Sequence, residues 1–258
     1  MRIVPHIPAT SEAAILARGL TKRYGDILAV DAIDIEVPRG EIVGLLGGNG
    51  AGKTTTIAML LGLLIPSAGT ITVLGEDMLR HRYRVLGRMN FSSPYIDLPK
   101  RLTVRENLTV YAELYGLRNS RARVEQVAGE IGIADFLGRR TGELSSGQRT
   151  RVALAKSLIN APELLLLDEP TASLDPDTAD WVRHYLLGYA KNTGASILVA
   201  SHNMLEVERL CSQTIMMKQG RIVDRGPPAA LIARYGRQTL EEVFLDIARG
   251  TAKLDAAQ

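Results

Sequence analysis

Hydrophobic residues in the first seventy positions predict two strands and a helix joined by a glycine-rich loop. Residues 33–37 alternate between apolar and acidic side chains, which is the period-two pattern of a half-buried strand. The apolar run at 41–46 predicts a fully buried strand that ends in glycines. Residues 53–64 then have the pattern of a helix, which Pro66 ends.

From Leu79 to Ile159 the hydrophobic spacing is mostly helical, and Thr103 with Glu106 has the spacing of a capping box. One face of the helix that follows carries Val104, Leu108, Tyr111, Leu114 and Tyr115. We expect this segment to form an inserted helical lobe.

Strands and helices alternate again in the last hundred residues. The apolar run 164–167 predicts a strand, 176–191 a helix and 196–200 another strand. Beyond two prolines, 229–235 and 240–248 read as short helices. The order of elements predicts an α/β fold with a parallel sheet and crossover helices.

Composition fits a compact protein of the reducing cytosol. The 258 residues are 46% hydrophobic and 23% charged, which is ordinary for a globular protein. The single cysteine, Cys211, cannot form an internal disulfide, and we expect it and Trp181 in the core. No apolar run approaches the roughly 20 residues of a membrane-spanning helix, and residues 1–13 lack the pattern of a signal peptide. Any membrane role is expected to be peripheral.

Charge is mild overall but uneven. A formal net charge of +3 gives no argument for nucleic acid as a partner. From Arg80 to Arg151, however, fourteen Lys or Arg stand against seven Asp or Glu. This basic middle region either faces acidic protein loops or an anionic lipid surface, or is ordinary solvated charge.

The glycine-rich loop at 47–54 reads Gly-Gly-Asn-Gly-Ala-Gly-Lys-Thr and matches the phosphate-loop pattern in its required place between strand and helix. Glycines let backbone N–H groups face phosphate oxygens, and the helix N-terminus adds its positive dipole end. Lys53 is expected to bridge the β- and γ-phosphates, and Thr54 to offer its hydroxyl to Mg²⁺. The expected nucleotide contacts here are Gly47, Asn49, Gly50, Ala51, Gly52, Lys53, Thr54 and Thr55.

Asp168 and Glu169 stand at the carboxyl end of the apolar run 164–167, where ligands bind open α/β sheets. Asp168 suits the Mg²⁺ shell, and Glu169 suits the base that orients and deprotonates an attacking water. The alternative is an ordinary strand end with acidic residues.

A second Ser- and Gly-containing loop, 144–148, precedes a helix whose apolar positions include Val152, Ala155 and Ile159. Such a loop at a helix start is either a second anion site or simply a helix cap.

Taken in order, these segments resemble the nucleotide-binding domain of the ATP-binding-cassette family. The phosphate loop resembles its Walker A motif, and Asp168 with Glu169 its Walker B pair. Residues 144–148 resemble the signature Leu-Ser-Gly-Gly-Gln. The likeness covers Ile15 to Gly226, most of the chain.

Three further positions carry the resemblance. Residues 173–175 are similar to the D-loop, which implies a nucleotide contact for Asp175. His202 is similar to the switch histidine, and Tyr24 stands where the family stacks an aromatic ring on adenine. Lone residues of these types are also common as caps and strand packing.

The chain departs from the family in two places. Ser146 replaces the first glycine of the signature, but Ser145, Gly147 and Gln148 remain. No glutamine stands at the Q-loop; Ser92 is the expected equivalent, with Asn90 as the alternative. Serine is shorter than glutamine and needs a water to reach Mg²⁺.

The resemblance implies a phosphate-loop NTPase (RecA-like) core with an N-terminal antiparallel β subdomain and an inserted helical subdomain. We expect residues 1–78 to hold the β subdomain and first part of the core, and 79–160 the helical insert. Residues 161–226 would complete the core, and 227–258 would be a short helical extension.

The resemblance also implies the function. Two copies, or this chain and a related subunit, would pair head to tail around two ATP molecules with Mg²⁺. They would power a permease on a separate chain, from the cytoplasmic face of the cell membrane. Lys53, Glu169 and His202 would be the catalytic residues.

Residues 101–108 and 240–245 resemble ATPase subunits of type-two exporters of drugs, lipids or polysaccharides. Two alternatives remain open. One is a cassette ATPase of translation or DNA repair, and the other is a regulatory cassette that hydrolyses ATP weakly or not at all.

Overall fold

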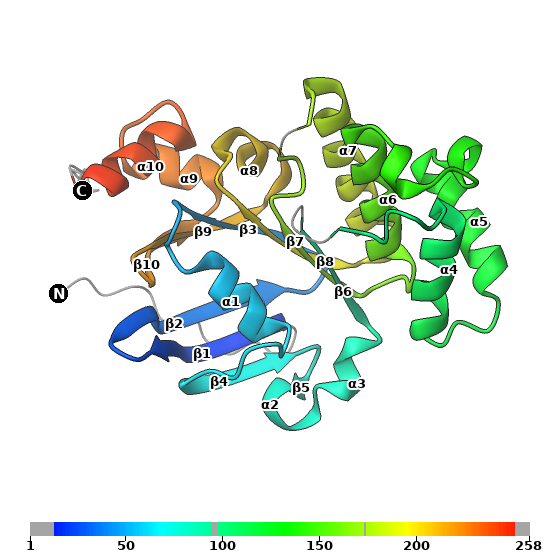
Figure 1. Cartoon of the computed structure of the whole chain (residues 1–258). Helices are drawn as coiled ribbons and strands as arrows, with labels where there is room; N and C mark the ends of the chain where they lie inside the picture. Colours follow the sequence, from blue (N-terminus) through cyan, green and yellow to red (C-terminus); the bar gives the residue numbers. More distant parts are fainter. Residues whose placement is uncertain (1–12, 94–96, 173, 251–258) are drawn as a thin grey trace.

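Two β-sheets and a set of helices form the part of the chain that the computed structural model describes, residues 13–93, 97–172 and 174–250 (Figure 1). The smaller sheet is antiparallel, with strand order β2-β1-β4-β5. Its strands are β1 (Ala13–Tyr24), β2 (Ile27–Pro38), β4 (Ala68–Val73) and β5 (Glu76–Asp77). The alternating segment 33–37 lies in β2, as predicted, with its apolar side chains buried.

The larger sheet has six strands in the order β10-β9-β3-β8-β7-β6. All neighbours are parallel except β9 and β10. The strands are β3 (Ile42–Gly47), β6 (Met89–Ser92), β7 (Leu164–Asp168), β8 (Ser196–Ser201), β9 (Gln213–Lys218) and β10 (Arg221–Gly226). The α/β class with a parallel sheet is therefore confirmed, and an antiparallel strand is added at one edge.

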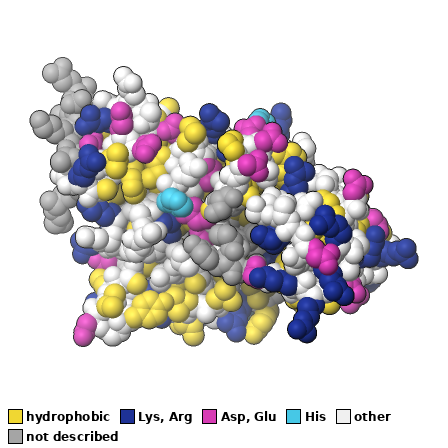
Figure 2. Space-filling model, turned by 45° about the horizontal axis from the view of Figure 1, so that its top comes forward, with side chains coloured by type: hydrophobic (Ala, Val, Ile, Leu, Met, Phe, Trp, Pro, Cys, Tyr) yellow, Lys and Arg dark blue, Asp and Glu magenta, His cyan; other side chains and the backbone are white. Residues whose placement is uncertain are grey.

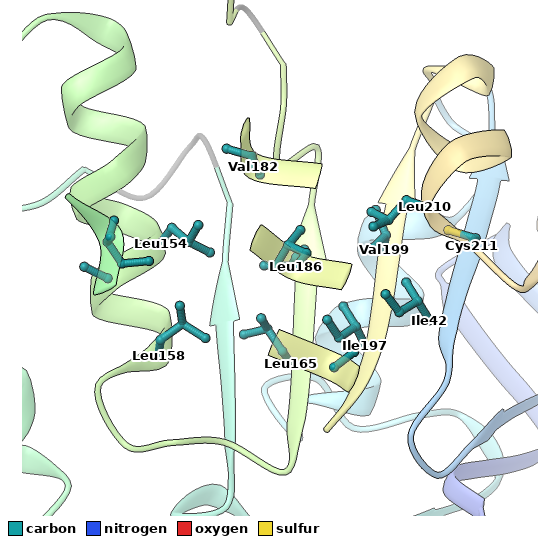
Figure 3. Packing of buried hydrophobic residues seen from close by; sticks show 14 of the residues in the cluster. Ile42, Leu154, Leu158, Leu165, Val182, Leu186, Ile197, Val199, Leu210 and Cys211 are labelled. Atoms are coloured by element: carbon teal, nitrogen blue, oxygen red, sulfur yellow. The ribbon is translucent and has the colours of Figure 1, made fainter. Parts of the chain in front are cut away.

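Side chains of the central strands alternate between two hydrophobic clusters. On β7, Leu164 and Leu166 join the cluster around α1 (Lys53–Leu60), whereas Leu165 and Leu167 join the cluster that reaches the helical lobe. Figure 3 shows part of the second cluster, with Leu158 of α6 near Leu165. Because both faces of these strands are covered, their sequences are continuously apolar. Leu→Ala at such a site costs about 2–5 kcal/mol.

Helix α1 is shorter than predicted. It ends at Leu60 rather than Leu64, because Gly62 adopts a left-handed backbone with φ of 68°. Figure 1 shows α1 between the two sheets, with its first turn near the end of β3. This position places the phosphate loop at the carboxyl edge of the larger sheet.

The helical lobe consists mainly of α4 (Val104–Leu114), α5 (Ser120–Ile131) and α6 (Ser146–Leu158). Thr103 and Glu106 form the predicted capping box. Leu114 was predicted to share a helix face with Val104 and Leu108, but it is exposed, whereas those two are buried together with Ala112. In Figure 2, Lys and Arg side chains gather at the end formed by this lobe.

Strand β6 lies inside the range 79–160 yet belongs to the six-stranded sheet. Two short helices precede it, α2 (Met78–His81) and α3 (Tyr83–Leu86). The helices of the lobe therefore follow β6, and the strand carries Ser92 toward the edge of the sheet where β7 ends.

The remaining helices are α7 (Pro176–Thr193), α8 (Met204–Leu210), α9 (Pro228–Arg234) and α10 (Leu240–Arg249). Cys211 is buried as predicted, and Trp181 is partly buried with the Arg151 guanidinium 4.2 Å from its ring centre. Among the described residues, no helix has both the length and the apolarity needed to cross a membrane.

Candidate functional site

The phosphate loop joins β3 to α1 and depends on glycine at specific positions. Gly52 has a φ of 104°, and a Cβ placed there would lie 2.7 Å from the carbonyl oxygen of Ala29. A Cβ at Gly47 would lie 2.7 Å from that of Ala51. Larger residues at either position would displace the loop from the adjoining strands.

The backbone N–H groups in the first turn of α1 have no side-chain cap. Gly52, its N-cap, provides no side-chain bond to the helix N–H groups, and no acidic residue lies in the first turn. Thr54 is exposed and Thr55 half-buried there. Free N–H groups and the positive end of the helix dipole make this turn an anion site.

Lys53 is held inside the loop. Its ammonium donates to the carbonyl oxygen of Gly47 at 2.6 Å and lies 3.4 Å from that of Gly48. The residue is only 8% exposed, and burial lowers its pKa, while the charges of Glu169 and Asp168 act to raise it. Among the described residues its direct partners are carbonyl oxygens, and a phosphate oxygen would supply an anionic one.

An open cleft of about 460 Å³ adjoins the loop. Its lining includes residues 48–55, which brings the predicted nucleotide contacts Asn49, Gly50, Ala51, Thr54 and Thr55 to one place. The sequence analysis missed the other lining residues, which come from the start of β2 and the β9–β10 turn: Ile27, Leu28, Ala29, Gln219 and Gly220. No local motif marks them, because the sheets assemble them from distant segments.

Asp168, at the end of β7, is 4% exposed. Burial raises its pKa, and the neighbouring Glu169 carboxylate adds to the rise, while Lys53 opposes it. A buried carboxylate in this position calls for a cation, and its oxygens with the Thr54 hydroxyl are the hard ligands that Mg²⁺ prefers. The donor set therefore fits Mg²⁺.

Glu169 has an unusual backbone. Its φ is 52°, a left-handed conformation that is uncommon for a residue with a Cβ. Its N–H donates to the carbonyl oxygen of Ala200 on β8 at 2.8 Å, which fixes the chain as it leaves β7. Strain of this kind persists where neighbouring structure enforces it.

Two groups from the end of β8 contact the Glu169 side chain. His202 Nδ1 lies 2.6 Å from Oε1, and the Ser201 hydroxyl lies 3.3 Å from Oε2. The His202 side chain is 63% exposed and that of Glu169 is 12% exposed. Because β7 and β8 are parallel neighbours, their carboxyl ends bring this acid and histidine together.

The two candidate Q-loop residues point to different surroundings. Ser92 lines a small cleft that is also lined by Asp168 and Glu169. Asn90 is 3% exposed, and its amide donates to the side-chain oxygen of Asn160 at 2.7 Å. Ser92 is thus the one of the two that borders the acidic pair.

The segment resembling the signature is an exposed helix start. Ser145 and Gln148 form a capping box in which each side chain bonds the backbone N–H of the other. A Cβ at Gly147 would lie 3.9 Å from a carboxylate oxygen of Asp175. Asp175 caps α7 by accepting from the Thr178 N–H, whose hydrogen bond lowers its pKa. Ser173 lies outside the described residues.

In the described part of the chain, the phosphate loop and the signature segment line different clefts. The cleft beside Lys53 includes no residue of 145–148 among its described lining. Leu144 and Ser146 line a different cavity of about 160 Å³, together with Leu98 and Leu174. Figure 1 shows the starts of α1 and α6 in separate parts of the molecule.

Tyr24 ends β1 and is 48% exposed. It pairs in the β1–β2 hairpin with Ile27, which lines the cleft beside the phosphate loop. The Lys22 ammonium lies 5.1 Å from its ring centre. The ring therefore lies near the cleft and is exposed enough to stack on a flat ligand.

A family model described as ABC transporter matches residues 30–172 of this chain. The Nod factor export ATP-binding protein I of Burkholderia orbicola (strain AU 1054) is 40% identical over 227 residues, 86% of this chain and 73% of that protein. The ABC transporter ATP-binding protein NatA of Bacillus subtilis (strain 168) is 36% identical over 232 residues, 87% of this chain and 94% of that protein.

Solved structures resemble the whole fold. An ATP-binding subunit of an ABC transporter superposes with a TM-score of 0.82 at 25% identity, covering 91% of this chain and 99% of that one. The protein cbiO1 of Clostridium perfringens, part of the ABC transporter complex cbiONQ, superposes with a TM-score of 0.77 at 28% identity, covering 93% and 97%.

Proposed function

The chain belongs to the ABC transporter family as an ATP-binding and ATP-hydrolysing subunit, and from this premise we propose that it powers export through a permease on a separate chain. The observation that supports ATP turnover most strongly is the Glu169–His202 contact, which lies at the same edge of the sheet as Lys53 and Asp168. A base, its partner, a buried cation and a buried acid are the parts that phosphoryl transfer needs.

The phosphate loop holds the triphosphate in this proposal. Backbone N–H groups of the loop and the first turn of α1 donate to phosphate oxygens, and Lys53 exchanges its carbonyl partners for the β- and γ-phosphates. Thr54 and Asp168 would hold Mg²⁺, and Ser92 would reach it through a water. When bound, Mg²⁺ neutralises charge that builds up on the phosphates.

Glu169 is the proposed general base. It accepts a proton from the attacking water as the water oxygen bonds to the γ-phosphorus and the bond to the bridging oxygen of ADP breaks. His202 holds one oxygen of Glu169 and is exposed enough to meet the γ-phosphate as well. Inorganic phosphate and ADP are the products.

A second copy, or a related ATPase subunit, completes each site. The signature segment does not line the cleft beside Lys53 of its own chain. It therefore has to contact the nucleotide that another subunit binds. In a head-to-tail pair, Ser145, Gly147 and Gln148 of one subunit face the ATP held by the other, and Asp175 lies beside them. Loss of the γ-phosphate then releases the pair.

Export as the direction of transport is supported by the relatives named for export, of which the chain covers 73% or more. A permease partner places the subunit on the cytoplasmic face of the cell membrane. The basic helical lobe gives this placement a surface that suits acidic loops of such a partner or anionic lipid.

Replacing Glu169 with glutamine tests the proposal. We expect ATP hydrolysis to fall by about 10²–10⁴-fold, because the amide cannot accept the proton. ATP binding should persist, and a dimer should accumulate in Mg²⁺-ATP on gel filtration. A matched control is Glu163→Gln, which makes the same acid-to-amide change. Glu163 directly precedes the first residue of β7, at the end far from the site, and pairs with Arg88. Full hydrolysis by Glu169→Gln, or a monomer in ATP, would contradict the proposal.

A further inference from the structure

A buried acid lies behind the Glu169–His202 pair. Glu206, on α8, is 1% exposed. Its carboxyl oxygens are 2.7 Å from the Thr171 hydroxyl and 2.8 Å from the Ser201 hydroxyl. Ser201 also lies 3.3 Å from Oε2 of Glu169, so one hydroxyl stands between two carboxyl groups.

The number of hydrogen atoms limits how this group of residues can bond. The Ser201 oxygen already accepts from the backbone N–H of Asn203 at 3.0 Å, and its hydroxyl has only one hydrogen to donate. If Glu206 and Glu169 are both charged, that hydrogen serves only one of the two carboxylate oxygens that face Ser201, and the other facing oxygen receives no hydrogen bond from it. A proton on Glu206 removes the conflict, because Glu206 then donates to Ser201, and Ser201 donates to Glu169.

We propose that Glu206 is a positioning residue for the ATPase reaction: it holds a proton and, through Ser201, fixes the second oxygen of the Glu169 side chain. This inference rests on the proposed role of Glu169 as the base. His202 holds Oε1 and Ser201 holds Oε2, so the carboxylate is fixed at two points. Two-point fixation aims the base at the attacking water, which affects turnover more than ATP binding.

The surroundings of Glu206 favour the protonated form. Burial raises its pKa most, and the charge of Glu169 adds to the rise, whereas hydrogen bonds from Thr171 and Ser201 and the charge of Arg183 on α7 act to lower it. Burial also raises the pKa of the Cys211 thiol, and the charge of Glu206 adds to that rise. The net direction of the pKa shift is upward, which favours a proton on Glu206.

Two substitutions of Glu206 distinguish a hydrogen-bond donor from a side chain that only fills the space. Glu206→Gln keeps an N–H donor toward Ser201 and an oxygen toward Thr171, so we expect kcat within about threefold of wild type. Glu206→Met fills similar space without any donor, and we expect kcat to fall about tenfold with KM for ATP unchanged. Ser201→Ala should reproduce that loss, and the double variant should be no worse than either single one.

Thr171→Val is the matched control, because it removes the other hydrogen bond to Glu206 without breaking the link to Glu169. We expect its effect on kcat to be smaller than that of Ser201→Ala. An equal loss in Thr171→Val would mean that the residues act through packing alone and would overturn the inference.

The dependence of kcat on pH gives a readout that packing does not supply. As pH rises through the pKa of Glu206, the proton is lost, Ser201 turns its hydrogen to the charged Glu206, and Glu169 loses its second anchor. Wild-type kcat should therefore fall as pH rises through the raised pKa of Glu206, and Glu206→Gln should lack this fall.

The experiment is the kcat–pH profile of wild type, Glu206→Gln and Ser201→Ala, with Glu169→Gln measured alongside. Identical profiles for wild type and Glu206→Gln, with Glu169→Gln inactive, would overturn the role of Glu206 alone. Hydrolysis by Glu169→Gln at the wild-type rate would instead overturn the proposed base. If Glu206→Met does not fold, the profiles of the other variants still decide the question.

Discussion

The phosphate loop and the signature segment are both glycine-containing loops that open a helix, yet their helix ends differ. The first turn of α1 has no side-chain cap, and Lys53 is buried with carbonyl partners. The first turn of α6 is already capped by Ser145 and Gln148, on an exposed surface. The phosphate loop therefore has a helix start without a side-chain cap and a buried charge, whereas the signature segment caps its own helix.

This difference shows how the work is divided between the two loops. The phosphate loop is preorganised to bind an anion within one chain. The signature segment caps its own helix and is therefore stable as an exposed surface. It can bind a nucleotide that another subunit holds. Variants in the two loops should therefore damage different steps, and each prediction below tests that separation.

The largest effect is expected at Lys53. Lys53→Ala removes the buried cation, and we expect kcat/KM for ATP hydrolysis to fall about 10³-fold, with ATP binding by a single chain clearly weakened. Calorimetric titration with a non-hydrolysable ATP analogue checks the binding. Unchanged affinity would mean that the phosphate loop is not the site that binds first.

A smaller effect is expected at Gly147, where a substitution should reduce ATP hydrolysis but not ATP binding. Its neighbours leave a Cβ 3.4 Å from the Thr178 hydroxyl, so Gly147→Ala should fold, but the added methyl group keeps the segment from a facing phosphate. We expect hydrolysis to fall roughly 10- to 100-fold, with ATP affinity of the single chain unchanged.

Gly129→Ala is the matched control for Gly147→Ala. Gly129 lies in α5, and a Cβ there has no atom within 4 Å. Its hydrolysis should equal that of wild type. A loss of ATP affinity in Gly147→Ala, measured by the same titration, would remove the contrast between the two loops.

Tyr24 lies near the cleft beside the phosphate loop, and its ring is exposed. Tyr24→Ala should raise KM for ATP about fivefold, because one stacking surface is lost, and leave kcat unchanged. Tyr24→Phe keeps the ring and serves as the control. Steady-state kinetics distinguish the two, and an equal rise in KM for both variants would argue against stacking.

The smallest effect is expected at Ser92. If its hydroxyl reaches Mg²⁺ only through a water, Ser92→Ala should lower kcat about two- to threefold. A loss as large as that in Lys53→Ala, seen in the same assay, would mean that Ser92 binds the metal directly.

Local patterns in the sequence predicted the strand–loop–helix unit, the acidic pair at the end of β7 and the capping box at Thr103. They sufficed because glycine spacing and hydrophobic periodicity act over a few residues. The early end of α1 was missed because Gly62 was read as part of the helix.

What the sequence could not predict are contacts between distant segments. The link from Glu206 through Ser201 to Glu169 joins α8, β8 and the end of β7, and appears only when parallel strands bring their carboxyl ends together. Glu206 also looks like a surface residue of a short helix until its burial is known. Packing, not local propensity, creates that site.

The most direct test of the account is whether one ATP site is built from two chains. Lys53→Ala and Ser145→Arg each disable one of the two loops, and each variant alone should be nearly inactive. When they are mixed in equal amounts, half of the pairs contain one intact site, so ATP hydrolysis should recover to about a quarter of wild type. A mixture no more active than either variant would contradict the shared site.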